Sequence, residues 1–279
     1  MYQTLIDFDA LHQRLGDPAW VLIDCRFDLA DPERGRKAYL ESHIPGALYA
    51  HLDEDLSGPP ILCGGRHPLP TAEALSAFFS RIGIDGGKQV VAYDGAGGSL
   101  AAARLWWLLR YLGHEAVAVL DGGWTAWREA GLPVRSGVET NPPSTFRSQP
   151  RNSWVVLADE ASRLPLLIDS RDPARYRGEV EPIDPVAGHI PGAINHFWKW
   201  NLDANGRFLG PGQLQENFLR VFKNTAPGDV VFYCGYGVTA CHNLLAVAHA
   251  GLSVPRLYAG SWSEWCSDPA RPVATGGQA

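Results

Sequence analysis

Four blocks of sequence occur twice in this chain, in the same order and about 140 residues apart. Such a repeat constrains the fold strongly, because both halves must form the same supersecondary structure. We therefore predict two copies of one domain, at residues 1–135 and 153–279, joined by a polar, proline-rich linker at 136–152. The repeated pairs are IDCRFD (23–28) and IDSRDP (168–173), SHIPGA (42–47) and GHIPGA (188–193), QVVAYDGAGGSLAAARLWWLL (89–109) and DVVFYCGYGVTACHNLLAVA (229–248), and DGGWTAW (121–127) and AGSWSEW (259–265).

Each copy alternates short β-branched runs with helical patterns. The runs VLI (21–23), VVAY (90–93) and VAVL (117–120) are typical of buried strands, and TAEALSAFFSRIG (71–83) is typical of a helix. Strands that alternate with helices favour parallel sheets. We therefore predict an α/β fold, in which each copy has a parallel sheet flanked by helices on both faces.

Composition narrows the classes of function. The 279 residues are 46% hydrophobic and 19% charged, as in globular proteins. The formal net charge is −6 and there is no long basic run, so we expect no nucleic-acid partner. The sequence contains no run of about 18 apolar residues, so we predict no membrane span. The first fifteen residues lack the apolar core of a signal peptide.

The cysteines indicate a reducing compartment. There are five, an odd number, and none forms a CxxC pair. This pattern favours free thiols over a disulfide framework or a zinc site, so we expect a cytoplasmic protein with no metal and no cofactor. The cysteines are Cys25, Cys63, Cys234, Cys241 and Cys266.

The two copies differ at the residue that follows one repeated strand. The apolar run 230–233 leads into Cys234, whereas the first copy has Asp94 at the equivalent position. In the second copy, Gly235 and Gly237 allow the backbone to curl so that successive N–H groups point into the turn. We therefore predict that the second copy carries the chemistry and that Cys234 is its nucleophile.

A helix is predicted to begin near Val238 or Thr239, because an apolar stripe follows at Cys241, Leu244, Leu245 and Ala248. Its N-terminus would favour the thiolate form of the cysteine before it. The Thr239 hydroxyl would contact the sulfur or cap the helix. The alternative is that Cys234 is a small apolar residue behind a buried strand.

Features that both copies share are expected to serve the shared fold. The histidine of HIPG precedes a Pro-Gly turn in each copy, and the tryptophan pairs lie one helical turn apart, which is typical of core residues. The same reasoning assigns Asp24 and Asp169 to the fold.

The loop sequence carries a resemblance. CGYGVTA resembles the CxxGVT active-site loop of thiosulfate and mercaptopyruvate sulfurtransferases, and IDSRDPARYRG…GHIPGAIN resembles the segment before that loop. The first half resembles the inactive copy in that family, which also has Asp where the cysteine would be. The chain is thus similar over nearly its whole length to the tandem-domain rhodanese-type sulfurtransferases. The resemblance implies that Cys234 takes a sulfane sulfur from a small anionic donor, becomes a persulfide, and passes the sulfur to a thiophilic acceptor such as cyanide or a thiol.

The resemblance also implies the residues that surround this sulfur. Arg175, in ARYRG, matches the arginine that binds the anionic group of the donor, and His67, in RHPLP, matches a histidine that faces the active site. Arg66 is a second candidate for donor binding, and Asp53 is a candidate acidic partner of His67. The active-site loop itself comprises Gly235, Tyr236, Gly237, Val238 and Thr239.

The identity of the donor stays open between thiosulfate and 3-mercaptopyruvate. Gly235 is typical of the mercaptopyruvate enzymes, but Tyr236 replaces their serine, and Asp184 stands where they have a second arginine. The loop also lacks the cations that are typical of thiosulfate enzymes. A third donor is the remaining alternative.

Two other functions are compatible with a cysteine in such a loop. One is a persulfide carrier that delivers sulfur to a partner protein without turnover. The other is a cysteine phosphatase, but these enzymes need a CxxxxxR loop and Ala240 occupies the arginine position here. Cys63, near His67, is the candidate resolving thiol if the site has a redox role.

Overall fold

The computed structural model describes residues 1–59, 65–95, 97 and 100–277. Contacts between Cα atoms divide the chain into two compact units. The first unit comprises residues 1–58, 70–151 and 204–208, and the second comprises 59–69, 152–203 and 209–279. Residues 65–69, which contain His67, therefore pack with the second unit.

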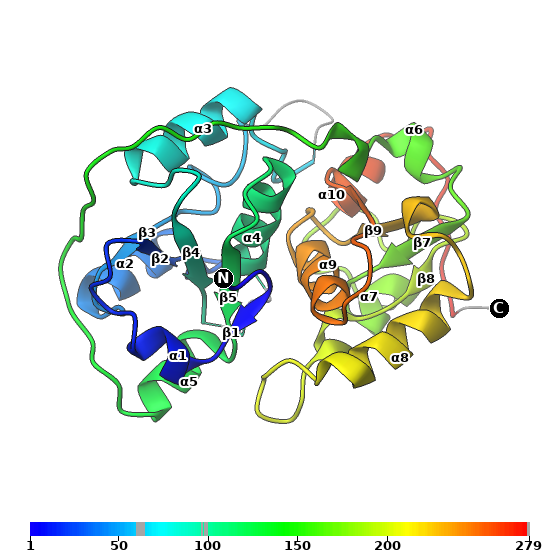
Figure 1. Cartoon of the computed structure of the whole chain (residues 1–279). Coiled ribbons are helices and arrows are strands. Elements are labelled where there is room, and N and C mark those ends of the chain that lie inside the picture. Colours follow the sequence, from blue (N-terminus) through cyan, green and yellow to red (C-terminus); the bar gives the residue numbers. More distant parts are fainter. Residues whose placement is uncertain (60–64, 96, 98–99, 278–279) are drawn as a thin grey trace. The chain divides into compact units, whose positions relative to one another are not determined.

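Five parallel strands form the sheet of the first unit, in the order β1-β5-β4-β2-β3 (Figure 1). The strands are β1 (Leu5–Ile6), β2 (Trp20–Asp24), β3 (Ala47–Tyr49), β4 (Gln89–Tyr93) and β5 (Val117–Leu120). The helices are α1 (Phe8–His12), α2 (Glu33–Glu41), α3 (Ala72–Arg81), α4 (Ala101–Tyr111) and α5 (Gly123–Glu129).

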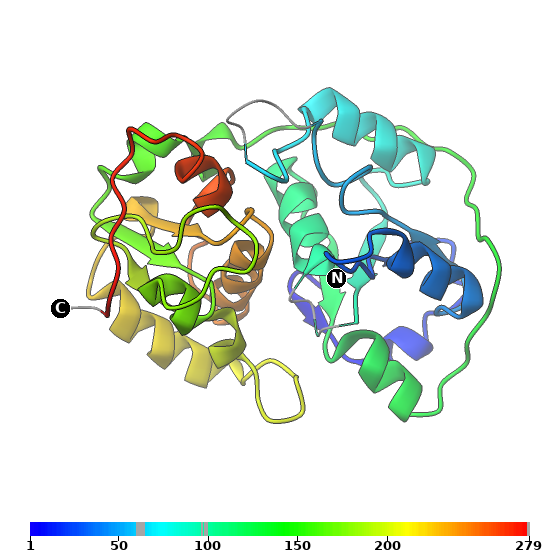
Figure 2. The same ribbon diagram turned by 180° about the vertical axis from the view of Figure 1, so that it is seen from behind.

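The second unit repeats this topology, with five parallel strands in the order β6-β10-β9-β7-β8 (Figure 2). The strands are β6 (Val155–Val156), β7 (Leu166–Asp169), β8 (Ile194–Asn195), β9 (Val230–Tyr233) and β10 (Arg256–Tyr258). The helices are α6 (Ala158–Ala161), α7 (Pro173–Arg177), α8 (Pro211–Phe222), α9 (Thr239–His249) and α10 (Ser261–Trp265), and the 3₁₀ turns are η1 (Asn152–Trp154), η2 (Trp198–Asn201) and η3 (Pro227–Asp229). The predicted repeat and the predicted α/β class are both confirmed.

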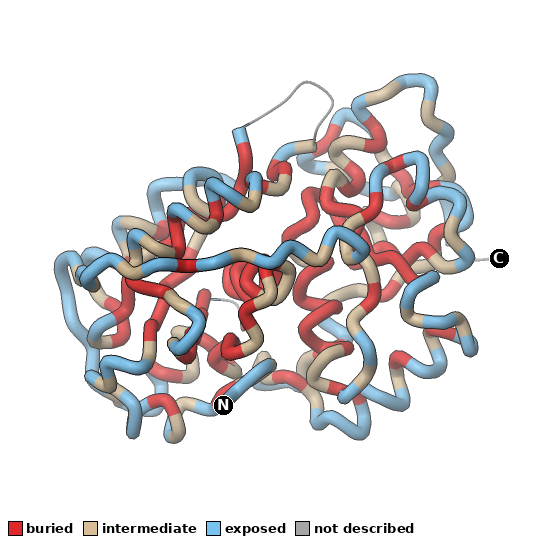
Figure 3. The backbone as a smooth tube through the Cα atoms, turned by 45° about the horizontal axis from the view of Figure 1, so that its top comes forward, coloured by how far each residue is buried: buried red, intermediate tan, exposed pale blue. Residues whose placement is uncertain are grey.

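Helices cover both faces of the second sheet. Along β9, Val231 and Tyr233 join a buried cluster with residues of α6, α7 and α10, such as Trp262. Phe232 points the other way, because side chains alternate along a strand, and its ring contacts Phe218 and Phe222 of α8. The central strands β4 and β9 are buried along their whole length, and Figure 3 shows how burial varies along the chain.

Identical buried clamps hold each half together. In the second unit Asp169 accepts hydrogen bonds from the backbone N–H, Nε and Nη2 of Arg171, and Asp24 and Arg26 repeat this arrangement in the first unit. Each aspartate thereby fixes an arginine that would otherwise be buried without a partner. This confirms that the repeated aspartates serve the fold.

The HIPG histidines are structural in the same way. Nδ1 of His189 lies 2.7 Å from the carbonyl oxygen of Tyr176, and its ring stacks on the Tyr176 ring at 3.9 Å. His43 makes the equivalent contacts with Tyr39. A histidine whose ring is committed to a backbone carbonyl in both copies anchors the turn rather than a substrate.

The segment predicted as a linker follows an extended path along the first unit. The Ser144 hydroxyl donates to the carbonyl of Ile84, and the backbone N–H of Phe146 donates to the Ser80 hydroxyl. Phe146 is buried. These contacts attach the segment to the first unit along much of its length. In the described part of the chain, no helix is both long and apolar enough to cross a membrane.

Candidate active site

Cys234 lies at the carboxyl end of β9, in the middle of the second sheet. All four strand residues before it are buried, and Cys234 is itself only 1% exposed. Its backbone N–H donates to the Ser261 hydroxyl over 3.1 Å, and its carbonyl accepts from the N–H of Trp262. The start of α10 therefore holds the peptide groups of the cysteine on both sides.

The two loop glycines have different physical roles. Gly237 has φ +73°, and a Cβ atom there would lie 2.3 Å from the carbonyl oxygen of Ala259, so only glycine fits. A Cβ atom on Gly235 would meet nothing closer than Nη1 of Arg175, at 3.6 Å. Gly237 therefore sets the curl of the loop, whereas Gly235 leaves space beside the guanidinium group of Arg175.

Helix α9 begins at Thr239, as predicted, but Thr239 does not cap it. The N-cap residue is Val238, and no side chain accepts a hydrogen bond there. The stripe residues Cys241, Leu244 and Leu245 are buried, and so is every other residue of 240–247, whereas Ala248 is partly exposed. The helix contacts β9, α8 and η2, so tertiary packing covers faces that the sequence pattern would leave to solvent.

Ser261 is a site residue that sequence reasoning missed. It is fully buried and has φ +56°, a left-handed conformation that costs a side-chain-bearing residue energy. The first copy has Gly123 at the equivalent position, with the same φ of +56°. The sequence feature that could have identified Ser261 is the serine of AGSWSEW, which stands where DGGWTAW has its second glycine. The Ser261 hydroxyl compensates by bonding the N–H of Cys234 and the carbonyl of Tyr258.

Arg175 lies against the loop, as its contact with Gly235 shows, and two buried carboxylates hold it. Glu181 accepts from its Nε at 3.2 Å and from its Nη2 at 2.5 Å, and Oδ2 of Asp184 lies 3.3 Å from the same Nη2. Glu181 also pairs with Arg171 at 3.2 Å. The Nη1 atom is the part of the Arg175 fork that faces the loop.

Arg66 reaches the same cluster from a distant part of the sequence. Its Nη2 donates to Oδ1 of Asp184 over 3.1 Å, and its backbone N–H donates to the Ser263 hydroxyl. The N–H of Ser263 in turn donates to the carbonyl of Gly235. Asp184 thus bridges two arginines. Burial, with the nearby charge of Glu181, raises the pKa of Asp184, although both arginines oppose this shift.

Tyr236 is the loop residue that packs against Arg66 and His67. The Arg66 guanidinium lies 5.0 Å from the centre of its ring, and the buried His67 ring packs edge-on against it at 5.6 Å. Tyr236 is 6% exposed, and its hydroxyl lies near enough to Arg175 for a hydrogen bond from that guanidinium group to lower its pKa. Burial raises the pKa of Tyr236 to about 12, so the hydroxyl keeps its proton at neutral pH.

The structure thus gathers the loop, Arg175, Arg66 and His67 in the second unit. Asp53 belongs to the first unit, where its backbone N–H donates to Nδ1 of His51. Cys63 lies outside the described residues. The four described cysteines are buried, and Sγ of Cys241 donates to the carbonyl of Gly237 over 3.3 Å.

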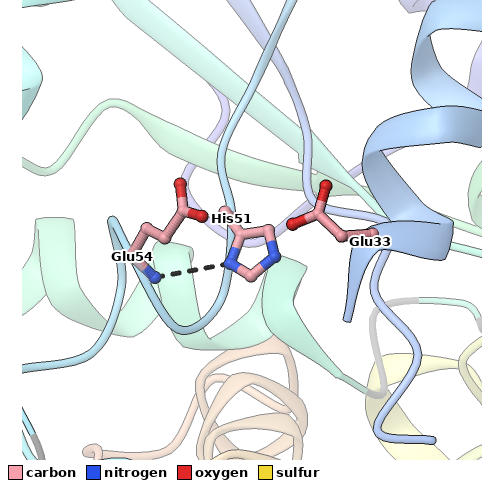
Figure 4. A group of neighbouring side chains, drawn as sticks. All are labelled: Glu33, His51 and Glu54. Carbon is pink, nitrogen blue, oxygen red and sulfur yellow. Dashed lines mark hydrogen bonds between the residues drawn. The ribbon is translucent and has the colours of Figure 1, made fainter. Parts of the chain in front are cut away.

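One group in the first unit resembles a metal site in composition, namely Glu33, His51 and Glu54 (Figure 4). The His51 ring is already committed, however. Its Nδ1 lies 3.2 and 3.4 Å from the N–H groups of Asp53 and Glu54, and its Nε2 lies 3.2 Å from the carbonyl of Pro32. A ring that accepts at one nitrogen and donates at the other has no lone pair for a metal. This cluster is therefore a structural anchor of the 51–54 turn.

Comparisons with known proteins agree with the observed fold and with the repeat in the sequence. The model of the rhodanese-like domain matches residues 7–130 and 154–268. A protein of Pseudomonas aeruginosa named "Probable 3-mercaptopyruvate sulfurtransferase" is 48% identical over 280 residues, which cover 98% of each chain.

Solved structures agree. The 3-mercaptopyruvate sulfurtransferase from Leishmania major superimposes with a TM-score of 0.83 at 30% identity, covering 94% of this chain and 74% of that one. SseA from Escherichia coli gives a TM-score of 0.79 at 30% identity, covering 94% of this chain and all of that one. With two rhodanese-like domains and similarity along its whole length to such enzymes, the chain belongs to the rhodanese family, as a tandem-domain sulfurtransferase.

Proposed function

We propose that Cys234 is the sulfur carrier of this sulfurtransferase, and that it cycles between a thiolate and a persulfide. The observation that supports this most is the position of Cys234 in a tightly curled loop that leads into the N-terminus of α9, with Arg175 alongside. Backbone N–H groups and a helix N-terminus stabilise an anionic sulfur without offering an acid that would release it.

The chemistry takes two steps. With thiosulfate, the Cys234 thiolate attacks the outer sulfur, the sulfur–sulfur bond of the donor breaks, and sulfite leaves with its electron pair. With 3-mercaptopyruvate, the Cys234 thiolate attacks the thiol sulfur, the carbon–sulfur bond breaks with its electron pair on the methylene carbon, and that carbon takes up the proton of the thiol, which gives pyruvate. An acceptor such as cyanide then attacks the outer sulfur of the persulfide, thiocyanate leaves, and the thiolate returns. Two half-reactions on one cysteine predict ping-pong kinetics.

Arg175, Arg66 and His67 form the donor side of this proposed site. A guanidinium group suits a carboxylate or sulfonate oxygen. Asp53, which lies in the first unit, stays a predicted acidic partner of His67. We propose a reducing, cytoplasmic compartment, because an odd number of cysteines without a CxxC pair favours thiols over a disulfide framework.

We propose further that the first copy, residues 1–135, is catalytically inactive, and that residues 153–279 form the catalytic domain. Asp94 stands at the cysteine position, and its Oδ2 accepts from the N–H groups of Leu100 at 3.1 Å and Ala102 at 3.2 Å. The carboxylate thus satisfies the first N–H groups of α4 itself, where an anionic sulfur would otherwise bind.

The test measures the persulfide directly. Wild-type protein would be incubated with each donor alone and its intact mass recorded, and thiocyanate formation would then be followed with cyanide. One added sulfur atom that is lost on adding cyanide is the expected result. Cys234→Ser should gain none, and Cys266→Ser, a change at another buried thiol, should behave like the wild type.

Three outcomes separate the alternatives. No added sulfur on the wild type would refute the proposed function. A persulfide that forms but does not turn over with small acceptors would indicate a carrier for an acceptor protein. Release of phosphate from a phosphate ester, with no added sulfur, would indicate the phosphatase alternative.

A further inference from the structure

The donor side of the site contains as many carboxylates as guanidinium groups. Three arginines, of which only Arg66 is exposed, and three buried carboxylates form one connected network, in which each ion pair joins opposite charges. The arginines are Arg66, Arg171 and Arg175, and the acids are Asp169, Glu181 and Asp184. Before any donor binds, the network therefore has no net charge.

Asp184 is the acid placed to influence a bound anion. Asp169 and Arg171 form a clamp that the first copy repeats, so their charges belong to the fold. Asp184 instead bridges Arg66 and Arg175, the two cations that lie beside Tyr236 and Gly235. Its carboxylate accepts a hydrogen bond from each of these two guanidinium groups. An anionic donor would otherwise bind the same N–H groups.

A second observation indicates that an uncharged group completes the site. The Tyr236 hydroxyl is buried beside these cations, and a hydrogen bond from Arg175 lowers its pKa against the effect of burial. Because an arginine can only donate, the O–H proton of Tyr236 is left to bind an oxygen atom of a ligand. Tyrosine offers one hydrogen bond and no charge, so it helps to bind an oxygen atom without attracting a second negative charge.

We propose that Asp184 is a charge filter that sets the donor specificity of this site, favouring sulfur donors with one negative charge over donors with two. Its fixed negative charge repels an incoming anion, and it repels a dianion twice as strongly as a monoanion. Arg66 acts in the opposite sense. It is 43% exposed and paired with Asp184, so its positive charge attracts the first negative charge of the donor.

This inference rests on the proposed persulfide cycle and concerns which donor feeds it. The test uses two donors that deliver the same outer sulfur but differ in charge. Thiosulfate carries two negative charges, and methanethiosulfonate carries one. In each case the Cys234 thiolate attacks the outer sulfur and breaks the sulfur–sulfur bond, releasing sulfite or methanesulfinate. The measured quantity is the ratio of kcat/KM for thiosulfate to kcat/KM for methanethiosulfonate, with cyanide as the acceptor.

The expected result for Asp184→Asn is a ratio about tenfold or more above that of the wild type, which corresponds to about 1.4 kcal/mol. Arg66→Gln should change the ratio in the opposite direction. The double variant should return towards the wild type, because it restores the charge balance. Asp159→Asn, which removes the same charge from a side chain that is 83% exposed, should leave the ratio unchanged.

Each outcome has one meaning. An unchanged or lower ratio in Asp184→Asn would overturn the filter, as would equal shifts in Asp184→Asn and Asp159→Asn. If Asp184→Asn does not fold, the direction of the Arg66→Gln shift decides alone, because Arg66 is on the surface. Failure of the wild type to form a Cys234 persulfide from either donor would refute the proposed function instead, so the two failures are distinguishable.

Discussion

Replacing Gly237 by alanine should disable the site through the backbone alone. An L-residue in the left-handed region costs about 1–2 kcal/mol. The new Cβ would also lie 2.3 Å from the carbonyl oxygen of Ala259, about 1 Å closer than van der Waals contact allows. Both atoms belong to the main chain or are fixed to it, so the loop must move by about that distance.

A displacement of about 1 Å in a reacting group costs about a hundredfold in rate. We therefore expect kcat/KM for the sulfur donor to fall by about 100-fold in Gly237→Ala, and stability to fall by at least about 1 kcal/mol. Stopped-flow measurement of persulfide formation gives the first quantity, and urea unfolding gives the second.

Two comparison variants isolate the cause. Gly212→Ala, near the start of α8, places a Cβ in open space and should leave both quantities close to the wild type. Gly235→Ala makes only ordinary contacts, at 3.6 Å or more, and should cost far less than Gly237→Ala. If Gly237→Ala kept the wild-type rate, or if the two loop variants were equally impaired, the reasoning from the left-handed turn would be refuted.

The remaining predictions concern charged groups. Arg175→Ala should lower kcat/KM for an anionic donor by about 10- to 100-fold, because a charged hydrogen bond contributes about 1.5–3 kcal/mol, and steady-state kinetics at varied donor concentration would check this; an unchanged value would remove Arg175 from the site. Asp169→Asn leaves the buried Arg171 without its main partner and should cost about 3 kcal/mol or more in urea unfolding, so a loss below about 1 kcal/mol would contradict the clamp. The pKa of Asp184 is raised by burial, so falling pH adds a proton to it earlier than to an ordinary aspartate and removes its charge. The ratio of thiosulfate to methanethiosulfonate use should therefore rise from pH 7 to pH 5 in the wild type, and it should rise less in Asp184→Asn; equal slopes would show that Asp184 is not the group involved.

Much of the fold could be predicted because it is encoded locally and then repeated. The β-branched runs at 90–93 and 230–233 became β4 and β9, and both sheets have the same strand order. The duplication also distinguishes residues that both copies share from residues that only one copy carries. Residues present in both copies, such as Asp24 and Asp169, proved to hold the fold, and the replacement of Asp94 by Cys234 located the candidate site.

Local patterns failed where packing decided the outcome. The apolar stripe on α9 indicated one buried face, but residues 240–247 are all buried, because the helix contacts β9, α8 and η2. The capping role expected of Thr239 was wrong for a related reason. A hydroxyl can cap only if its residue precedes the first helical turn, and here the turn already includes Thr239.

By itself the sequence determined the duplication, the α/β class and the cysteine that only one copy carries. The tertiary structure decided which charges surround the loop. Arg66 and Asp184 are 118 residues apart and meet because residues 65–69 pack with the second unit. Ser261 meets Cys234 because the end of β10 lies beside the end of β9. Periodicity and turn chemistry act between near neighbours in the chain, whereas such contacts depend on the path of the whole chain, which no local pattern records.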